Sequence, residues 1–440
     1  MRKSFLFAAL IAAPAVAQGD PAADVSQERL RADIEALVGF GTRHTLSTQT
    51  DPTRGIGAAR AWGERQFREV SQACGGCLEV VTPERMITGD RIPEPVRLVD
   101  VVAIQRGSDR PNEVVIVQGH IDSRVSDVMD AARDAPGAND DGSGTALVLE
   151  AARVLSQHRY PTTIVYALLS GEEQGLYGGK LLAEYAAQQG WTVKAVLNND
   201  IVGGSCGSDG YCDAAHVRVF SEGPRADATA KTLAAMARNG GENDSPSRNL
   251  SRFVAGLADD SELAVRQVWR TDRMGRGGDQ VPFLEKGYPA IRFSVAVEDY
   301  NRQHQDLRTE GGVTYGDTID AMDFPYLAKV TQLNVRTLDA LARAPMPPAP
   351  TAEAAVQTFT RLHWQPVPGA AEYSVWRRRT DAPQWDPVPV REHVVGTEIE
   401  LPGVRGDDWL FGVNSVAADG SVSAIASAVP GGAFGPLGSD

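Results

Sequence analysis

The sequence lacks an apolar run long enough to cross a membrane and lacks an excess of basic residues. The apolar run near its start, residues 5–13, is far shorter than the ~20 residues that a membrane-spanning helix needs. The 440 residues carry a formal net charge of -14, whereas nucleic-acid-binding proteins carry a basic footprint. We therefore expect no transmembrane segment and no nucleic-acid partner.

Cysteine is scarce, and its four residues form two close pairs. Cys74 and Cys77 make a C-x-x-C, and Cys206 and Cys212 bracket five residues. In a cytosolic protein this spacing would suggest a zinc knuckle or a redox pair, whereas an exported protein more often uses such pairs as local disulfides. We expect two local disulfides, although the sequence leaves a crossed pairing open.

The N-terminus has the pattern of a secretory signal peptide. Arg2 and Lys3 precede the apolar run, which is followed by Ala15-Val16-Ala17. This is the charged, hydrophobic and small-residue order of a cleaved leader, which predicts a signal peptide at residues 1–17. The residue directly after the cleavage point is Gln18 and not a cysteine, which argues against a lipoprotein. The mature protein is expected to be periplasmic or extracellular.

The rest of the chain divides at a proline-rich segment. Residues 24–344 alternate apolar strand patterns with amphipathic helices, which predicts an α/β domain. Residues 345–351 contain the sequence PMPPAP and predict a stiff linker. Residues 352–435 consist of short alternating strands with turn signals between them, as in a small all-β sandwich.

Within the α/β domain, three short β-branched runs predict buried strands of a parallel sheet, at residues 114–118, 163–169 and 193–197. Helices are predicted at residues 145–157, 259–267 and 324–342, a single strand at 97–104, and a glycine-rich loop at 203–223. In open α/β sheets, ligands bind just beyond the carboxyl ends of the strands. The residues that follow the three buried strands are therefore the first place to seek chemistry.

Each of these strands ends in polar residues that an ordinary connection would not need. They are His120 and Asp122 after the first strand, Glu172 and Glu173 after the second, and Asp200 after the third, with Asp140 and Asp141 at the start of the intervening helix. Imidazole and carboxylate together suit zinc, although cobalt or manganese could substitute. Two zinc ions held close together need about three protein ligands each, one of them shared.

Two of these residues have predicted roles other than metal binding. Asp122 is placed to hold the second ring nitrogen of His120, as the partners of metal-bound histidines usually do. Glu172 remains free to act as general base on a water molecule. Taken singly, each motif has an ordinary explanation: Asp140-Asp141-Gly142, for example, would usually be a helix-capping turn.

Together the motifs resemble those of the M28 family of dizinc metallopeptidases, which includes secreted bacterial aminopeptidases. The resemblance covers residues 25–343 and rests on H-x-D at 120–122, N-D-D-G-S-G at 139–144, G-E-E-x-G-L-x-G at 171–178, N-D at 199–200 and a late histidine, His304. It implies a three-layer α/β/α, mixed-sheet zinc exopeptidase domain, here followed by the β-sandwich.

The resemblance also implies the site residues. His120, Asp140 and Asp200 would hold one zinc ion, and Asp140, Glu173 and His304 the other. Glu172 would be the general base, Asp122 and Asp141 would support the ligands, and the peptide bond between Asp140 and Asp141 is often cis in the family. The assignment of His304 rests mainly on the resemblance.

The chain departs from the family pattern on the substrate side. Many relatives have Asp-His where this chain has Asp279-Gln280, and some have a tyrosine where it has Gln303. Tyr300 is the nearest tyrosine and is a candidate for an oxyanion hydrogen bond. The departures concern specificity and leave the expected metal ligands in place.

The C-terminal segment resembles a fibronectin type III module, with Trp364 and Tyr373 at core positions. Such a module is a candidate for binding a surface or a protein partner, for shaping substrate entry, or for stabilising the protein.

The predicted function is that of an exported hydrolase: a zinc-dependent exopeptidase with two Zn²⁺ per chain that removes N-terminal residues from peptide substrates. A carboxypeptidase or dipeptidase of the same family is an alternative, for which Arg292, Arg302 or Arg308 would hold a substrate carboxylate. Glutaminyl cyclase chemistry uses one zinc ion and fits the ligand set less well. A binding protein on an inactive peptidase scaffold would typically have lost a ligand or the base, and this chain keeps them all.

Overall fold

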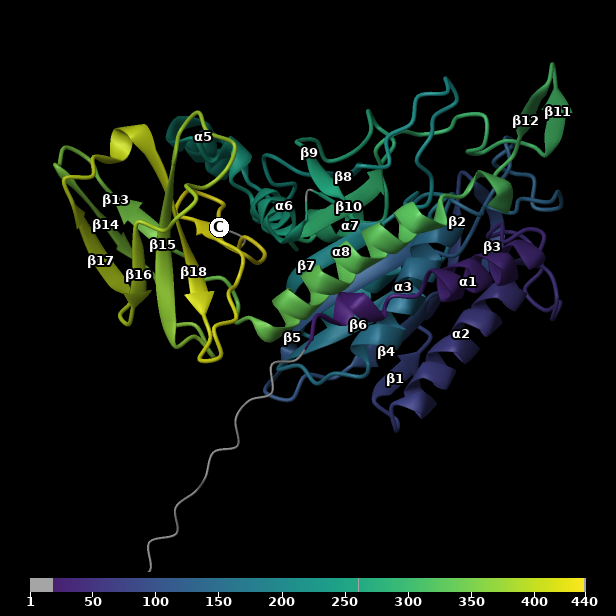
Figure 1. Ribbon diagram of the computed structural model, residues 1–440, viewed down its shortest axis with the longest axis horizontal. Helices are drawn as coiled ribbons and strands as arrows, with labels where there is room; N and C mark the ends of the chain where they lie inside the picture. The colour runs from purple at the N-terminus through teal and green to yellow at the C-terminus, as the bar shows by residue number, and fades with distance from the viewer. Residues whose placement is uncertain (1–18, 260, 439–440) are drawn as a thin grey trace, which may run out of the picture.

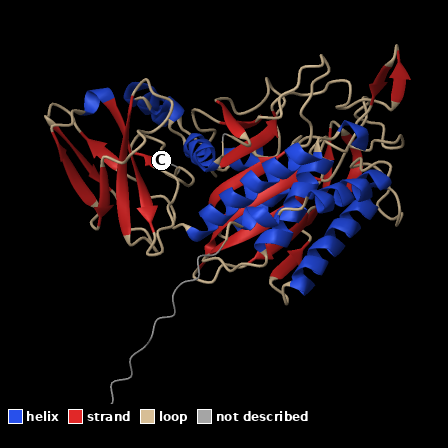
Figure 2. Ribbon diagram, viewed as in Figure 1, coloured by secondary structure: helices blue, strands red, loops and turns tan. Residues whose placement is uncertain are grey.

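The computed structural model of the protein describes residues 19–259 and 261–438, so the signal peptide predicted at residues 1–17 lies outside the described residues. The protein has a large α/β part and, at one end of its long axis, a smaller β part (Figures 1 and 2). Among the described residues, none of the helices combines the length and the apolar character needed to span a bilayer.

The helices are α1 (Gln27–Gly39), α2 (Gly55–Ala73), α3 (Gly142–Leu155), α4 (Tyr177–Gln188), α5 (Ala230–Asn239), α6 (Pro246–Leu257), α7 (Val281–Glu285) and α8 (Phe324–Arg343). The strands of the large part are β1 (Leu78–Val81), β2 (Glu84–Gly89), β3 (Ile92–Val99), β4 (Val101–Gln105), β5 (Arg110–His120), β6 (Thr162–Leu169), β7 (Thr192–Asn199), β8 (His216–Ser221), β9 (Ala264–Val268), β10 (Ala290–Val295), β11 (Arg308–Glu310) and β12 (Val313–Tyr315). Those of the small part are β13 (Thr351–Glu353), β14 (Phe359–His363), β15 (Glu372–Arg379), β16 (Arg391–Val394), β17 (Glu398–Pro402), β18 (Trp409–Val416) and β19 (Ala426–Ser427).

An eight-stranded mixed sheet forms the centre of the large part, in the order β1-β4-β6-β5-β7-β10-β8-β9. The four central strands β6, β5, β7 and β10 are parallel to their neighbours within this group, so their carboxyl ends meet at one edge. Every residue of β6 is buried. Burial on both faces explains why its sequence is a continuous apolar run, because each face of the strand packs against a helical layer.

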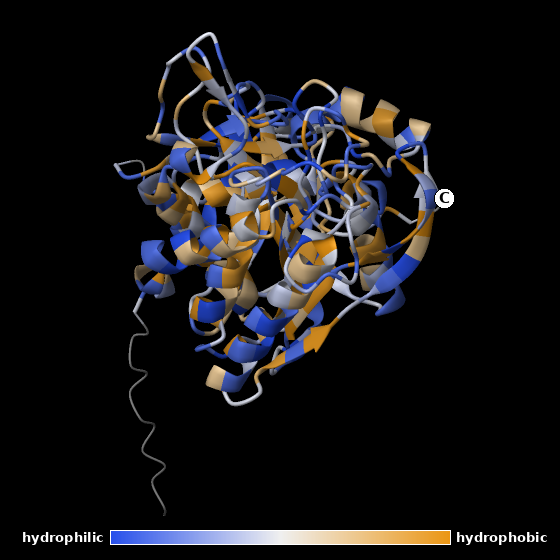
Figure 3. Ribbon diagram, turned by 90° about the vertical axis from the view of Figure 1, so that its right-hand side faces the viewer, coloured by the Kyte–Doolittle hydropathy of each residue, from blue (hydrophilic) through white to orange (hydrophobic). Residues whose placement is uncertain are grey.

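Helices cover both faces of this sheet and make three layers. Helices α1, α2, α3, α6 and α8 contribute to the core on one face, and α4 and α7 to the core on the other. The helices carry both hydrophilic and hydrophobic residues (Figure 3), and their apolar side chains face the sheet. Each fully buried valine, leucine or isoleucine contributes about 1.5–3 kcal/mol to stability. The three-layer α/β/α prediction is confirmed.

Three sequence predictions for single elements are wrong. The strand predicted at 97–104 is broken at Asp100, whose buried carboxylate accepts a hydrogen bond from the Ser170 amide, 3.0 Å away. The helix prediction at 259–267 is wrong, because the edge strand β9 occupies most of the second half of this segment. A helix that was not predicted, α6, lies before it, where Ser245 caps the first turn and Pro246 begins the helix. The predicted loop at 203–223 ends in strand β8.

The two predicted local disulfides are confirmed. One joins Cys74 to Cys77, directly after helix α2. The other joins Cys206 to Cys212, in the loop between β7 and β8. The crossed pairing that the sequence left open does not occur.

The small part consists of two antiparallel sheets, ordered β13-β14-β17 and β16-β15-β18-β19. Leu362 and Leu401 from the first sheet share one core with Tyr373, Val375 and Val413 from the second. The part therefore has its own apolar core between two sheets. Its likeness to a fibronectin type III module stays a prediction.

Candidate metal centre

Polar side chains converge where strands β5, β6 and β7 end. His120 is the last residue of β5, Glu172 and Glu173 follow β6, and Asp200 follows β7. Since β5 lies between β6 and β7 and all three are parallel, their ends share one edge of the sheet. This arrangement places residues that are far apart in the sequence beside one another.

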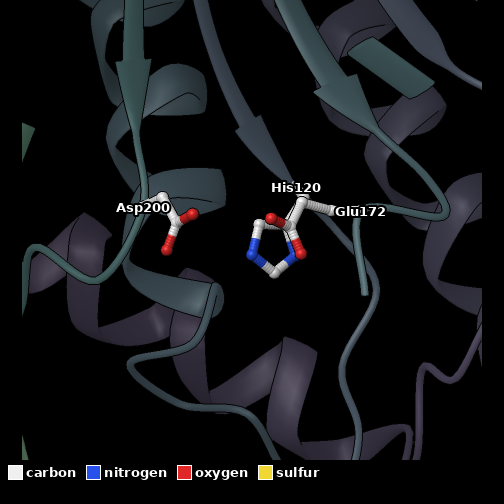
Figure 4. Close-up of side chains that lie close together, drawn as sticks. All are labelled: His120, Glu172 and Asp200. Atoms are coloured by element: carbon white, nitrogen blue, oxygen red, sulfur yellow. The ribbon is translucent and has the colours of Figure 1, made fainter. Parts of the chain in front are cut away.

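The first group consists of His120, Glu172 and Asp200 (Figure 4). Each offers one ligand atom, and these atoms lie within 4.8 Å of one another. His120 and Asp200 are buried, and Glu172 is half-buried. A group of one imidazole and two carboxylates at this separation has the chemistry of a site for a divalent cation.

The second group consists of Asp140, Glu173 and His304, again with ligand atoms within 4.8 Å of one another. His304 Nε2 lies 3.0 Å from Glu173 Oε1 and 2.9 Å from Asp140 Oδ2. His304 comes from the loop between β10 and β11, and this loop brings its ring beside Asp140 and Glu173.

Asp140 links the two groups through its two carboxylate oxygens. Oδ1 lies 3.2 Å from His120 Nε2, and Oδ2 lies 2.9 Å from His304 Nε2. Each oxygen of this carboxylate therefore faces a different imidazole. The structure brings together all five residues that the sequence predicted as ligands.

The neighbours of Asp140 fix its position. The amides of Asn139 and Asp140 both donate to the buried carboxylate of Asp317, at 3.0 and 2.7 Å. Asp141, joined to Asp140 by a cis peptide bond, accepts hydrogen bonds from the amides of His120 and Ile201, at 2.9 and 3.2 Å. Asp141 also caps α3 by accepting from an amide of its first turn. Asp141 therefore ties together the start of α3 and the ends of β5 and β7.

Asp122 supports His120 differently from the prediction. The ring nitrogen Nδ1 of His120 lies 3.1 Å from the main-chain carbonyl oxygen of Asp122 and 3.5 Å from its carboxylate. The carboxylate instead accepts hydrogen bonds from the amides of Glu172 and Glu173, both at 3.3 Å, and from the Thr45 hydroxyl at 2.9 Å. It thus fixes the loop that carries two residues of the centre.

The centre contains more carboxylates than cationic groups, and the pKa values reflect this. Burial opposes the charge of the His304 imidazolium, but Glu173 and Asp140 outweigh it and raise the pKa to about 10. Burial alone would raise the pKa of Asp140, but the two histidines hold it well below its ordinary range. Burial raises the pKa of Glu172 well above its ordinary range. Such a concentration of negative charge is the environment that divalent cations require.

Two charged residues that contact the centre, Arg124 and Asp317, have no role predicted from the sequence, and a third, Arg292, has a contact other than the predicted one. Arg124 Nε donates to Glu173 Oε2 at 2.9 Å, and its Nη2 lies 2.6 Å from His304 Nδ1. Arg292, fully buried in β10, lies 2.7 Å from Asp200 Oδ1. Arg124 follows Asp122 by two residues at the same strand end, and Arg292 interrupts an apolar strand, so both carried a signal. No pattern in the sequence pointed to Asp317.

Some predicted residues lie elsewhere. The Tyr300 side chain is 57 % exposed and lies beside Arg276, outside the set of side chains that line the cavity at the centre. Arg302 pairs with Asp320, and Arg308 with Glu310. Neither lines this cavity, and Arg292 is buried behind it.

The profile of peptidase family M28 matches residues 100–335. A probable zinc metalloprotease of Leptosphaeria maculans is 44 % identical over 93 % of this chain and 96 % of its own length. One of Pyricularia oryzae is 42 % identical over 93 % of this chain and 83 % of its own length. These relatives are fungal, whereas the sequence resemblance was to bacterial aminopeptidases.

Solved bacterial structures share the fold. LapB of Legionella pneumophila superposes with a TM-score of 0.54 at 18 % identity, over 73 % of both chains. The LapA aminopeptidase of the same organism gives a TM-score of 0.52 at 19 % identity, over 78 % of this chain and 80 % of its own. At this identity the likeness shows the fold alone.

Proposed function

The chain belongs to peptidase family M28 and is a zinc metallopeptidase, and we propose that it is a two-zinc exopeptidase that removes residues from the free amino end of peptides. One observation carries the proposal: two histidine–carboxylate groups share Asp140, with one oxygen facing each imidazole. This is the donor arrangement that two adjacent metal ions require.

The donor set fits zinc, which prefers imidazole nitrogen and carboxylate oxygen where cysteine is absent. His120, Asp140 and Asp200 would hold one ion, and Asp140, Glu173 and His304 the other. Bound zinc supplies Lewis acidity that polarises the scissile carbonyl and lowers the pKa of the attacking water. The protein must then provide a proton acceptor and hold the ligands in place.

Glu172 is the proton acceptor in this proposal. Its carboxylate lies within 4.8 Å of ligand atoms on His120 and Asp200. Asp140 Oδ1, 3.2 Å from His120 Nε2, would be the third ligand beside His120 and Asp200, which leaves the Glu172 carboxylate for the water. Glu172 takes a proton from the water that attacks the scissile carbonyl. It then gives that proton to the amine as the peptide bond breaks, which leaves a carboxylate and a free amine.

Three residues position these groups. Asp122 holds the amides of Glu172 and Glu173, Arg124 holds the Glu173 carboxylate, and Arg292 holds Asp200. Partners of this kind orient ligands and tune their basicity. The ion pair of Arg292 with Asp200 leaves the other oxygen of Asp200 for metal.

The proposal that residues are removed from the N-terminus is more specific than the proposal of a zinc exopeptidase. It is supported by the sequence resemblance and by the description of LapA as an aminopeptidase. Carboxypeptidase or dipeptidase activity is the second candidate, because arginine side chains line the cavity at the centre and would hold a substrate carboxylate.

We also propose that the protein is exported through the signal peptide predicted at residues 1–17. Two disulfides are typical of proteins that mature in an oxidising compartment, which supports this location. Peptides are the proposed substrates, and the small β part remains a candidate surface for a protein or cell-surface partner.

The test is hydrolysis of two peptides that differ only in N-terminal acetylation, by the zinc-loaded protein with and without a chelator. We expect chelator-sensitive release of the first residue from the free-amine peptide alone, seen by mass spectrometry. Release of C-terminal residues from both peptides would make the protein a carboxypeptidase. No cleavage of either would overturn the proposal in favour of a binding role.

A further inference from the structure

Four arginines line the cavity that opens onto the metal centre. The cavity has a volume of about 510 Å³, and Arg91, Arg124, Arg273 and Arg276 belong to its wall. The whole chain carries a formal net charge of -14, so this density of positive charge is a local feature of the cavity. A cluster of one sign in a concave site focuses the field and attracts ligands of the opposite sign.

The wall formed by Arg273 and Arg276 has more positive than negative charge. Arg273 Nη1 and Arg276 Nη2 both contact Glu298 Oε2, at 2.9 and 3.1 Å, and Arg218 Nη2 contacts Oε1 at 2.6 Å. One carboxylate thus serves three guanidinium groups. The Arg273 side chain is only 9 % exposed, and its Nε has no hydrogen-bond partner among the described residues.

Two arginines on this cavity are accessible to a ligand. The Arg276 side chain is 41 % exposed, and both of its hydrogen bonds use Nη2, which contacts Glu298 and Gln303. Arg91 is exposed and donates from Nη1 to the neutral carbonyl of Glu173, at 2.9 Å. Within the described part of the chain, no ion pair includes Arg91.

The carboxylates of the cavity do not cancel this charge in the working enzyme. They are Asp140, Glu172, Glu173 and Asp200, which are the proposed ligands and the proposed base. Two Zn²⁺ ions would offset their negative charge. Among the described residues, Glu298 would then be the one remaining carboxylate that forms ion pairs with the cavity arginines. The metal-loaded cavity would then be positive along the wall that carries Arg273 and Arg276.

We propose that this cavity selects substrates that carry a carboxylate close to the scissile bond, and that Arg276 and Arg91 bind this carboxylate. Buried Arg273 adds to the positive electrostatic potential of the cavity. The inference rests on the proposed peptidase function and names its substrate class. Guanidinium groups bind carboxylates through paired, charge-assisted hydrogen bonds. The carboxylate is either the side chain of an acidic first residue or the C-terminus of a short peptide.

Matched substrates separate these two sources. Glu-Ala-Ala amide and Gln-Ala-Ala amide differ in side-chain charge, and Ala-Ala-Ala differs from its amide in C-terminal charge. We expect the zinc-loaded full chain to hydrolyse the charged member of one pair with a kcat/KM at least about 10-fold higher, and the ratio to shrink at high salt because screening weakens the attraction. The pair that shows the preference identifies the source of the carboxylate.

Substitution of the arginines tests the assignment. R276Q and R91Q should each lower that preference at least about 5-fold, whereas R276K, which keeps the charge, should retain part of it. R68Q is the matched control, because Arg68 on α2 is exposed and, within the described ranges, its side chain has Glu64 as its one ion-pair partner. It should leave both the rates and the preference unchanged. Equal hydrolysis within both pairs would overturn this inference and leave the peptidase proposal standing.

A binding measurement covers the case in which no peptide is cleaved. Calorimetry of the zinc-loaded protein would compare glutarate, which carries two carboxylates, with its neutral diamide. Binding of glutarate alone, weakened in R276Q and kept in R68Q, would support the anion-selective cavity even if the peptidase proposal failed. Equal binding of both probes, or binding of neither, would overturn it.

Discussion

The backbone amide of Glu172 donates a hydrogen bond to a carboxylate oxygen of Asp122, 3.3 Å away. The next amide, that of Glu173, donates to the second oxygen at the same distance. Asp122 is fully buried, and its carboxylate holds the loop after β6 in place through these two hydrogen bonds. The proposed base and a proposed ligand therefore depend on one side chain that is not among those lining the cavity at the centre.

We predict that D122N lowers kcat by about 10–100-fold, the usual effect of losing such a partner, while the protein remains folded. The amide NH₂ of asparagine cannot accept one of the two backbone hydrogen bonds, so the loop shifts. Steady-state kinetics and circular dichroism check this, with D109N, at an exposed aspartate, as control. Wild-type kcat in D122N would contradict the positioning role.

E172Q should reduce kcat by about 10²–10⁴-fold, the typical contribution of a general base, because the amide cannot accept the proton from water. The variant should still bind two zinc ions per chain, measured by inductively coupled plasma mass spectrometry. A loss of one zinc ion would mean instead that Glu172 is a ligand, since it lies in the same group as His120 and Asp200.

Asp140 and His304 should differ in their effect on metal content. D140N weakens the ligand that faces both imidazoles, so both zinc ions should be lost or reduced together. H304A removes a ligand of one group and should leave about one zinc ion per chain, because each group needs about three protein ligands. The zinc content of each variant is measured after dialysis. Equal loss of zinc in both variants would argue against an Asp140 that is shared by the two ions.

The small β part is held to the large part by a buried ion pair. Arg378 Nη2 lies 2.6 Å from Asp244 Oδ2, and neither side chain is more than 2 % exposed. We predict that R378M lowers stability by about 3–5 kcal/mol, since it leaves a buried carboxylate without its cation. Urea unfolding measures this. The double variant R378M/D244L should lose less than the sum of the single variants, and simple additivity would contradict direct coupling.

Glu222 should make stability depend on pH. Burial raises its pKa from an ordinary value of 4.5 to about 7, so the folded state keeps a proton that the unfolded chain has lost. Stability from this group is full below pH 4.5 and is lost as the pH rises through 7. E222Q has no charge to bury and keeps an oxygen for the Ala226 amide.

At pH 8, E222Q should therefore be more stable than the wild type by up to about 3 kcal/mol, at about 1.4 kcal/mol per pKa unit. The difference should vanish near pH 4.5. Urea unfolding of both proteins at the two pH values checks this, and a difference that is the same at both would rule out the titration of Glu222 as its cause.

The sequence by itself determined the α/β fold and the place of the centre. Continuous β-branched runs had to become buried strands, and parallel strands end at one edge, so His120, Glu173 and Asp200 had to meet. The motif order added Asp140 and His304. These signals are local and periodic, which is why they can be read before folding.

Only the tertiary structure decided which partners hold these residues. Asp317 accepts a hydrogen bond from the amide of Asp140, and Arg292 forms an ion pair with Asp200. The ion pair of Arg378 with Asp244 joins the two parts of the chain. The cavity arginines come from three separate loops, between β2 and β3, after β5, and between β9 and α7, so no periodicity connects them. Their proximity arises from the packing of loops around the sheet edge, and long-range packing leaves no local pattern in the sequence.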